Sequence, residues 1–385
     1  MVGCSFDRFK NLVTLLLTKL PRYGVKSATR VVVWKRTTPD AFYAGTIRRL
    51  IPWEDTMRTV QYMKLFSIIS VLTVLAGCQR HSTDETYYLI SNNLDLAYWK
   101  TAVAGFNKAA AQYHVTAKVD GPNNYNAQAE AEAFDKAVAA HPAGILVSVA
   151  DASLMAAQID AALDKGIPVI TMDSDAPHSH RIFFIGTNNR EAGHLGGQRV
   201  VDKLNGKGNV VFFTMPGQPN LDERLNGYLE TFASHPGIKV AEIFNIKGDS
   251  GNAFDRTKQY LTQTGDKKID AFICLEASSG KDVGAVLKQS NATDRLLVAM
   301  DVDSDTLNLI KDGTIDATIA QKPYTMAFYG LKALDEIHHY PVKNLRTDFA
   351  VDSFSPFPVF IDTGTAQVDK GNVDIYIQSA KEAQQ

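Results

Sequence analysis

The sequence lacks the features that mark metal-binding, disulfide-bonded and many catalytic proteins. Its three cysteines, Cys4, Cys78 and Cys274, form no CxxC pair and show no metal-ligand spacing with histidine. Patterns of the forms GxxxxGK[ST], HExxH and GxSxG are also absent. We therefore expect no disulfide framework, no metal and no cofactor. Cys274 lies in the apolar run AFICL and is expected to be a small buried hydrophobe.

Charge is nearly balanced over the chain but unevenly distributed along it. The 385 residues carry a formal net charge of -2, and 45% of them are hydrophobic, which suits a globular protein of two domains. Residues 1–62 contain eleven Lys/Arg and four Asp/Glu, whereas the remainder contains 29 basic and 38 acidic residues. An acidic main body argues against nucleic acid as a partner.

A short apolar run begins at Met63. Lys64 is a minimal basic segment, and the run Leu65–Leu75 is too short to span a bilayer comfortably. The tetrapeptide Leu75-Ala76-Gly77-Cys78 resembles the bacterial lipoprotein signal, or lipobox. By this resemblance, residues 63–77 are a signal peptide, and Cys78 becomes a lipid anchor followed by a tether at residues 78–86.

Residues 1–62 do not have the pattern of the rest of the chain. A lipobox acts only near an N-terminus, so we expect these residues to reflect a misassigned start codon, with translation starting at Met57 or Met63. The alternative is a genuine extension with an internal membrane helix. N-terminal sequencing of the native protein separates the two, because an intact Met1 form in cells would reject the first.

From Tyr87 onward, short apolar runs alternate with helical patterns. In the first series, strands are expected at 87–90, 115–119, 144–149, 169–172 and 182–185, and helices at 97–113, 126–140 and 154–164. In the second, helices are expected at 190–204, 222–233, 253–263 and 281–289, and strands at 210–213, 240–244, 271–275, 296–300 and 315–320. Such alternation predicts doubly wound parallel α/β sheets, and two series are too many strands for one sheet. We predict two similar lobes.

The most informative stretch is AMDVDSDTLNLIKDGTIDATIAQKP, residues 299–323. Asp301 directly follows the apolar run LLVAM, Gly313 can end the helix that comes next, and Gln321 follows another strand. The candidate N-caps of that helix are Asp303, Ser304 and Asp305. One βαβ unit thus puts an acid and an amide at strand ends, where open α/β sheets bind ligands.

This stretch resembles the ribose-binding group of the type I periplasmic sugar-binding proteins. In that family an Asp after a strand and a Gln in an ATIAQ segment contact the sugar, which implies these roles for Asp301 and Gln321. The alternative for Asp301 is a plain helix cap. The family has three crossings between its lobes, which we place near Thr187–Asn189, Gln321–Pro323 and Phe349–Ser353. The first lobe then holds residues 87–187 and about 322–350, and the second 188–321 and about 351–385.

Sugar sites combine polar groups at the rim with aromatic plates. By counting back from Gly105, the resemblance puts Tyr98 and Trp99 on two stacking positions. The alternative is that this pair packs its helix onto the sheet. The hydrogen-bonding candidates just before them are Ser91, Asn92 and Asn93. The family's Asn before its aromatics falls on Leu96, so that contact is lost.

Three further first-lobe positions follow from the resemblance. Ser148 stands where relatives often have Asn. Asp173, in TMDS, falls on a sugar-contacting Asp, with helix capping as the alternative. Thr187 matches the first crossing and is equally well explained as a hinge residue alone.

In the second lobe, DERLNGYLETF resembles the family's RERGEGF. This puts Arg224 on the Arg that bonds two sugar oxygens, with a salt bridge to Glu223 or another acid as the alternative. Phe254 matches an aromatic near the ligand, or is plain core. Leu275 and Glu276 replace the family's Asn and Asp, and Glu276 either reaches the ligand or caps the next helix. These departures indicate a ligand other than ribose.

Two acids such as Asp173 and Asp301 could act as a glycosidase pair, but hydroxyl recognition uses the same residues and the family performs no chemistry. We therefore predict no enzymatic activity.

We expect a membrane-anchored, extracytoplasmic (periplasmic) monomer that carries a sugar to the permease subunits of an ABC importer. The alternatives are a sensory protein acting on a chemoreceptor or sensor kinase, and a transcription regulator of the same fold. A regulator would need a helix-turn-helix, which residues 1–62 do not show.

Overall fold

The computed structural model describes residues 81–382. The predicted signal peptide, Cys4 and the predicted lipidation site at Cys78 lie outside the described residues. Among the residues that are described, no helix has both the length and the apolar character needed to cross a bilayer.

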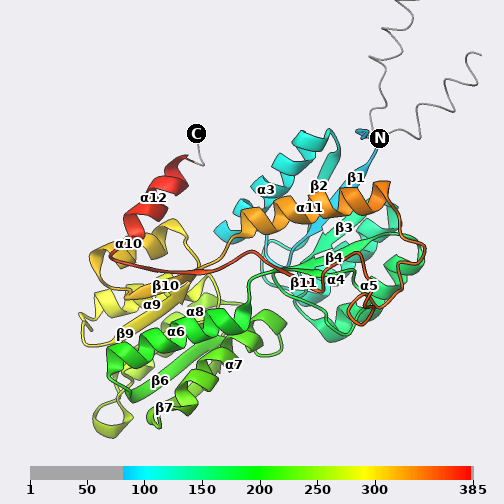
Figure 1. Cartoon of the computed structure of the whole chain (residues 1–385). Helices are drawn as coiled ribbons and strands as arrows, with labels where there is room; N and C mark the ends of the chain where they lie inside the picture. Colours follow the sequence, from blue (N-terminus) through cyan, green and yellow to red (C-terminus); the bar gives the residue numbers. More distant parts are fainter. Residues whose placement is uncertain (1–80, 383–385) are drawn as a thin grey trace, which may run out of the picture. The chain divides into compact units, whose positions relative to one another are not determined.

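The first lobe is built on a six-stranded sheet with the order β11-β5-β4-β3-β1-β2. All its pairings are parallel. Its strands are β1 (Thr86–Ile90), β2 (Thr116–Asp120), β3 (Gly144–Val147), β4 (Val169–Met172), β5 (Phe184–Gly186) and β11 (Phe360–Asp362). Its helices are α3 (Ala97–Tyr113), α4 (Ala127–Ala139), α5 (Ala152–Asp164) and α11 (Pro323–His339). Helix α11, far along the chain, packs beside α3 (Figure 1).

The second lobe repeats this plan with the order β12-β10-β9-β8-β6-β7. Its strands are β6 (Lys207–Thr214), β7 (Gly237–Asn245), β8 (Ala271–Cys274), β9 (Leu296–Met300), β10 (Ala317–Ala320) and β12 (Ala366–Asp369). Its helices are α6 (Asn189–Leu204), α7 (Pro219–Ala233), α8 (Ser250–Leu261), α9 (Ser279–Gln289), α10 (Ser304–Asp312) and α12 (Val373–Glu382), with a short 3-10 turn η1 (Gly265–Lys267). Only β12 breaks the parallel rule, because it pairs antiparallel with β10. The predicted class, two doubly wound α/β lobes, is confirmed.

Local sequence explains why these elements form. Strands β3 (GILV) and β8 (AFIC) are buried along their whole length, as expected of strands covered by helices on both faces. Among the three candidate caps of α10, Asp303 is the N-cap, and its carboxylate accepts from the backbone N–H groups of Asp305 and Thr306. Gly313 ends α10 with a φ of 89°, a left-handed conformation that suits glycine.

The matching strand orders give the two acids of the cleft equivalent places. Asp173 follows β4 and Asp301 follows β9, and each of these strands is third from the β11 or β12 edge of its sheet. The carboxyl ends of parallel strands are where open α/β sheets bind ligands. The repeated topology therefore supplies one acid from each lobe.

Three crossings join the lobes. The first two are residues 187–188, between β5 and α6, and residues 321–322, between β10 and α11. The third is residues 363–365, between β11 and β12, so the prediction near Phe349–Ser353 is wrong. The chain stays in the first lobe longer than predicted because β11 adds to that sheet beside β5. Backbone N–H of Thr363 donates to the carbonyl of Gly186 at 2.8 Å, and Thr365 Oγ1 donates to the carbonyl of Ala320 at 2.8 Å, which ties the crossings together.

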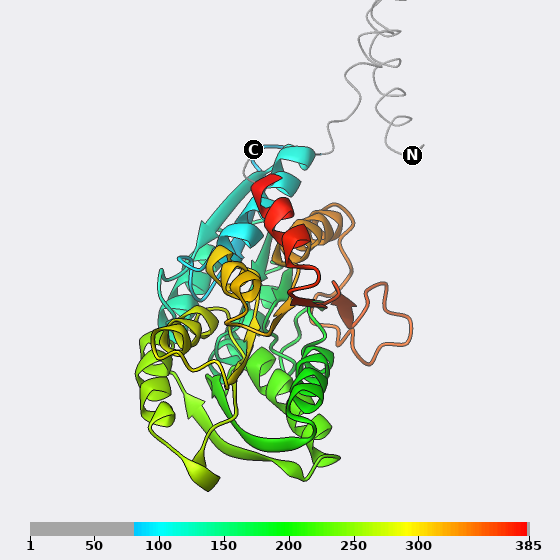
Figure 2. The same cartoon turned by 90° about the vertical axis from the view of Figure 1, so that its left-hand side faces the viewer.

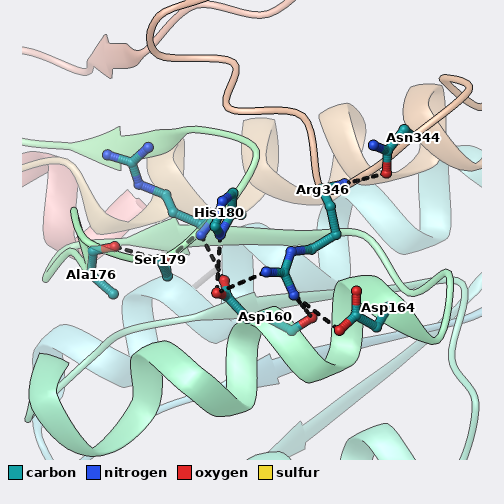
Figure 3. Close-up of polar contacts among 8 residues, drawn as sticks. Asp160, Asp164, Ala176, Ser179, His180, Asn344 and Arg346 are labelled. Carbon is teal, nitrogen blue, oxygen red and sulfur yellow. Dashed lines mark hydrogen bonds and ion pairs between the residues drawn. The ribbon is translucent and has the colours of Figure 1, made fainter.

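The segment between α11 and β11 is long and irregular (Figure 2). Arg346 fastens it to α5: its Nη1 donates to Asp164 Oδ2 at 2.9 Å, and its Nη2 lies 3.5 Å from Asp160 Oδ2. Asp160 also bonds the ring of His180, with 3.0 Å between Oδ2 and Nδ1 (Figure 3). This cluster explains how an irregular segment reaches the edge strand β11 without a helix of its own.

Candidate ligand-binding site

A small cavity of about 60 Å³ lies at the carboxyl ends of both sheets. The first lobe lines it with Asn92, Asn93, Leu96, Tyr98, Trp99, Tyr125 and Asp173. The second lobe lines it with Met215, Gln218, Asn220, Leu221, Arg224, Ile246, Gly248, Glu276, Ala277, Ser278 and Asp301. Gln321, on the second crossing, completes the lining. The cavity is concave, mixes polar with aromatic groups and draws on both lobes, as small-molecule sites do.

The two acids are held in an unusual backbone conformation. Asp173 has a φ of 63° and Asp301 a φ of 69°, in the left-handed region that few residues other than glycine adopt. Both are buried. Burial raises the pKa of both carboxyls, that of Asp301 to about 7, while the positive charge of Arg224 opposes the rise. Strain and burial together are typical of functional positions.

Asp173 is the centre of a hydrogen-bond network that reaches across the lobes. Tyr98 donates its hydroxyl to Oδ1 at 2.8 Å, and Ser148 donates to Oδ2 at 3.1 Å. From the second lobe, Asn220 donates its amide to Oδ2 at 3.3 Å. Ser148 does not line the cavity, so its effect on a ligand would pass through Asp173.

A second network joins Asp301 to the crossings. The amide of Gln321 donates to Asp301 Oδ1 at 3.0 Å, and its Oε1 accepts from Thr187 Oγ1 at 2.8 Å and from Arg224 Nη2 at 2.9 Å. Thr187 thus links the first crossing to the second and does not line the cavity. Any change in the angle between the lobes has to act on these bonds.

Arg224 is buried, and three of its five N–H donors bond groups of the second lobe and the second crossing. Besides Gln321, it donates from Nε to Asn189 Oδ1 at 2.8 Å and from Nη1 to the carbonyl of Leu275 at 2.8 Å. The salt bridge with Glu223 does not form, because Glu223 pairs with Arg190 instead. A guanidinium fixed by three bonds presents its remaining donors without further loss of side-chain entropy.

The helix pair α6 and α7 positions Arg224 by unusually close packing (Figure 1). A Cβ on Gly193 of α6 would lie 2.1 Å from the carbonyl oxygen of Arg224, and a Cβ on Gly227 of α7 would lie 2.1 Å from the carbonyl oxygen of Arg190. Only glycine permits this approach, so Gly227 in the segment RLNGYLETF and Gly193 in the segment EAGHLGG matter for the site as well as for the fold.

The aromatic wall comes from the start of α3. Tyr98 and Trp99 both line the cavity, with ring centroids 5.2 Å apart at an angle of 80°. Tyr125, which was not among the residues predicted from the sequence, adds a third aromatic ring and contacts Gly248 of the other lobe. Aromatic faces of this kind suit the apolar C–H surface of a sugar ring.

Glu276 bonds the start of α9 and also lines the cavity, so its position is compatible with both roles that the sequence left open. Its carboxylate accepts from the backbone N–H groups of Ser278 at 2.6 Å and Ser279 at 2.8 Å, at the start of α9, and it also lines the cavity. Phe254 lies outside the lining, with the ammonium group of Lys258 4.1 Å from the centre of its ring. Ser91 is buried behind the cavity, where its hydroxyl accepts from the backbone N–H of Asn93.

Three amide oxygens of the cavity wall have no hydrogen-bond partner. They belong to Asn93, Gln218 and Asn220, and all three are buried. A buried acceptor without a donor is costly and rare in proteins. Gln218 and Asn220 were not among the residues predicted from the sequence. Their signal was the polar segment GQPN between a buried strand and a helix, which is also the sequence context of Asp301. The wall therefore has acceptors in place for a ligand that carries several O–H or N–H groups.

The arrangement of two α/β lobes, three crossings and an interlobe cavity defines a two-lobe binding protein of the periplasmic type. Residues 87–338 match the model of the periplasmic binding protein domain. The chain therefore belongs to the periplasmic binding protein family.

Individual relatives agree with this assignment. The ribose import binding protein RbsB of Haemophilus influenzae is 26% identical over 282 residues, covering 71% of this chain and 93% of that protein. The xylose/arabinose-binding protein XylF of Sulfolobus acidocaldarius is 26% identical over 62% of this chain, which spans only 59% of that protein's length. A solved sugar-binding protein of a sugar ABC transporter from Bacillus halodurans is 33% identical, with a TM-score of 0.66, over 76% of this chain and 99% of its own.

These comparisons confirm the resemblance to the type I periplasmic sugar-binding proteins of ABC transporters that the sequence predicted. They also confirm that the chain is not an enzyme, because its relatives are binding proteins for transport. Membership of this family implies an extracytoplasmic location.

Proposed function

We propose that this protein captures a sugar or sugar-like small molecule between its lobes and delivers it to the permease subunits of an ABC importer. The observation that carries the proposal is the set of unpartnered acceptors on Asn93, Gln218 and Asn220 beside the acids Asp173 and Asp301. A monosaccharide offers hydroxyl donors for such oxygens and a C–H face for the aromatic wall.

Relatives support this ligand class. They include a xylitol-binding protein of Mycolicibacterium smegmatis, 24% identical over 66% of this chain, and a solute-binding protein of Burkholderia graminis solved in complex with D-arabinose. The Burkholderia structure is 27% identical, with a TM-score of 0.68, over 75% of this chain and 96% of its own. Small pentoses and polyols are therefore the first ligands to try.

In this proposal, ligand binding favours the closed form of the two lobes. A ligand held by Asp173 on one wall and Asp301 on the other interacts fully only when the lobes are close together, so it shifts the population toward that form. The bond between Asn220 and Asp173 and the contact between Tyr125 and Gly248 belong to the same closed arrangement. Permease subunits would then distinguish loaded from empty protein by shape.

A thermal-shift screen of pentoses, hexoses and polyols tests the proposal. At least one compound is expected to raise the Tm, because a ligand that binds only the folded state stabilises it. Asp301→Ala should abolish the shift, whereas Asp305→Asn, an exposed acid in the same stretch, should keep it. An undiminished shift in Asp301→Ala would contradict the assigned cavity.

We also propose that Cys78 is lipidated and anchors a monomeric protein to the membrane through residues 78–86. The support is the lipobox at residues 75–78. In cells, Cys78→Ser should move the protein from the membrane fraction to the soluble fraction, and unchanged fractionation would reject the anchor.

A second candidate function is sensing rather than transport. It is favoured by one structural neighbour, 25% identical with a TM-score of 0.66, whose structure is that of a XylFII–LytSN complex and thus includes a second protein. Here ligand-induced closure would be read by a chemoreceptor or sensor kinase. Deleting the gene should reduce uptake of labelled ligand if the protein feeds an importer, and should leave uptake intact if it only signals.

A further inference from the structure

Two histidines and two carboxylates meet outside the cavity, where the start of the described chain contacts the end of α11. His81 and Glu85 precede β1, while Asp335 and His339 lie one turn apart on α11. One ligand atom from each of the four lies within 4.8 Å of all the others. Helical spacing explains how α11 supplies two of them from one face.

The separations suit a tetrahedral metal site. Zn²⁺ binds imidazole nitrogen and carboxylate oxygen at about 2.0–2.2 Å, so neighbouring donors around a tetrahedral ion lie about 3.4 Å apart. His81 Nδ1 is 3.1 Å from Asp335 Oδ1, and His339 Nε2 is 3.1 Å from Glu85 Oε2 and 3.6 Å from Asp335 Oδ1. Small adjustments of the side chains would bring all four donors to one ion.

The charges of the four residues also favour a bound metal ion. In the described part of the chain, neither Glu85 nor Asp335 forms an ion pair with a lysine or arginine. Asp335 is only 4% exposed, and buried carboxylates are normally paired or bound to metal. A dication would balance the two negative charges and allow both imidazoles to be neutral, the form that binds metals.

The surroundings of the cluster resemble those that orient metal ligands elsewhere. The hydroxyl of Tyr87 donates to Asp335 Oδ1 at 3.3 Å, and such outer hydrogen bonds fix ligating carboxylates. The backbone carbonyl of Glu85 accepts from the N–H of Thr116 at 2.9 Å, which holds the start of β1 in place. The ring of His81 packs edge-on against that of His339, with centroids 4.8 Å apart.

We propose that His81, Glu85, Asp335 and His339 bind one Zn²⁺ ion, which fastens the segment entering β1 to the C-terminal end of α11. Two imidazoles with two carboxylates favour zinc over Mg²⁺ or Ca²⁺, which prefer all-oxygen sites. Sequence spacing could not reveal the site, because the histidine–carboxylate pairs His81–Asp335 and Glu85–His339 are each separated by 254 positions. The inference is independent of what the cavity binds.

The proposed zinc site bears on the membrane tether. His81 follows the proposed lipidation site Cys78 after two intervening residues. Fixing His81 on α11 would leave only those two residues of sequence between the proposed lipid anchor and a fixed point of the first lobe. The ion would thereby limit how far the lobes can move from the membrane surface.

Calorimetric titration of Zn²⁺ into the chelator-treated, full-length chain tests the site. One ion per chain is expected, and His81→Ala and His339→Ala should each weaken binding at least about tenfold. His338→Ala is the matched control, because this exposed neighbour lies outside the cluster, and it should bind as the original chain does. Glu85→Gln, which conserves shape, provides a second ligand variant whose folding can be checked by circular dichroism.

Co²⁺ gives an independent readout, since a tetrahedral Co²⁺ site has characteristic visible absorption that should vanish in His339→Ala. Several results would overturn the proposal: no stoichiometric zinc binding, equal weakening in His338→Ala, or binding that persists in both histidine variants because the cysteines hold the metal. None of these results would affect the thermal-shift test of sugar binding, so the two proposals fail separately.

Discussion

Asp173 and Asp301 combine three properties that rarely coincide in residues with a purely structural role. Each has a positive φ, each is buried, and each has a raised pKa. A helix cap needs none of these, since Asp303 caps α10 from an ordinary extended conformation. Strain and burial at these two residues cost free energy in the unliganded protein. A ligand whose hydroxyl groups donate hydrogen bonds to the two carboxyls would offset that cost.

The raised pKa of Asp301 predicts a dependence of stability on pH. In the unfolded chain an Asp titrates near about 3.9, whereas in the folded protein the pKa of Asp301 is about 7. Between these two pKa values the folded state binds more protons than the unfolded state. The contribution of protonated Asp301 to the free energy of unfolding is therefore complete below about pH 4, and it is lost as the pH rises toward about 7. Asp301→Asn should remove this decrease in the free energy of unfolding with pH, which is on the order of 1.4 kcal/mol per unit of pKa shift.

Urea unfolding of both proteins at about pH 5 and about pH 7 measures this difference. Asp305→Asn, at an exposed position, should retain the slope of the original chain. Equal slopes in Asp301→Asn and the original chain would mean that Asp301 is ionised throughout the range.

Asn220 is predicted to hold the ligand from the second lobe. Its Nδ2 is bonded to Asp173 and its Oδ1 is unpartnered, so Asn220→Ala removes one cross-lobe bond and one acceptor. We expect ligand affinity to fall about tenfold, the usual effect of losing one or two hydrogen bonds. Calorimetry should find normal affinity in Asn226→Ala, on the same helix but outside the cavity; equal affinities in all three proteins would remove Asn220 from the site.

At the residue scale, the sequence predicted the positions tied to strand ends. Asp301 and Gln321 were selected because each directly follows a buried strand, and Asp173 because the segment TMDS resembles the family segment that holds a sugar-contacting Asp. Gln218 and Asn220 were missed because they belong to the first turn of α7 and its cap, where an amide is ordinarily explained by capping. Their importance depends on the other lobe, which no local pattern encodes.

Among the elements, the pair α6 and α7 does most to shape the second wall. These helices approach closely at Gly193 and Gly227, and Arg224 lies on α7 at that contact. A methyl group at either glycine would push α7 away from α6. Since Arg224 bonds Asn189 of α6, its guanidinium would move with respect to the crossings.

Gly193→Ala is therefore expected to lower both the free energy of unfolding and ligand affinity. The added methyl overlaps backbone atoms that cannot move independently, and overpacking of this kind costs about 1–3 kcal/mol. Gly251→Ala is the control, because its methyl would meet only the side chain of Asp249 near the start of α8. Urea unfolding and calorimetry measure the two effects, and a Gly193→Ala protein as stable as the control would refute the packing argument.

The strands and helices were largely predictable because periodicity and buried runs are local properties. What could not be predicted is how the last segments pair. Residues 351–362 contain Phe354, Phe357 and two prolines without alternation, so the sequence did not mark β11 as an edge strand of the first sheet. The antiparallel strand β12 was missed for a related reason: AQVD is short and lies only partly in the core.

For the whole molecule, the crossings between the lobes both join the lobes and contribute to the ligand-binding cavity. Gln321 bonds Asp301, Arg224 and Thr187 at once, so ligand contacts and hinge geometry share one side chain. The proposed zinc cluster adds a fixed point between the tether and α11, the helix that directly follows the second crossing. Helix α11 would thus be connected both to the ligand-binding cavity, through the second crossing, and to the membrane tether, through the zinc cluster.

The most direct test of the account is a calorimetric titration of the best monosaccharide from the screen into the original chain, Asp173→Ala and Asp301→Ala. The account predicts one ligand per chain, with binding lost or at least about a hundredfold weaker in each variant, because each removes a carboxyl group that bonds the ligand from a different lobe. Unimpaired binding in either variant, or no binding of any sugar by the original chain, would contradict the claim that both lobes hold a sugar between them.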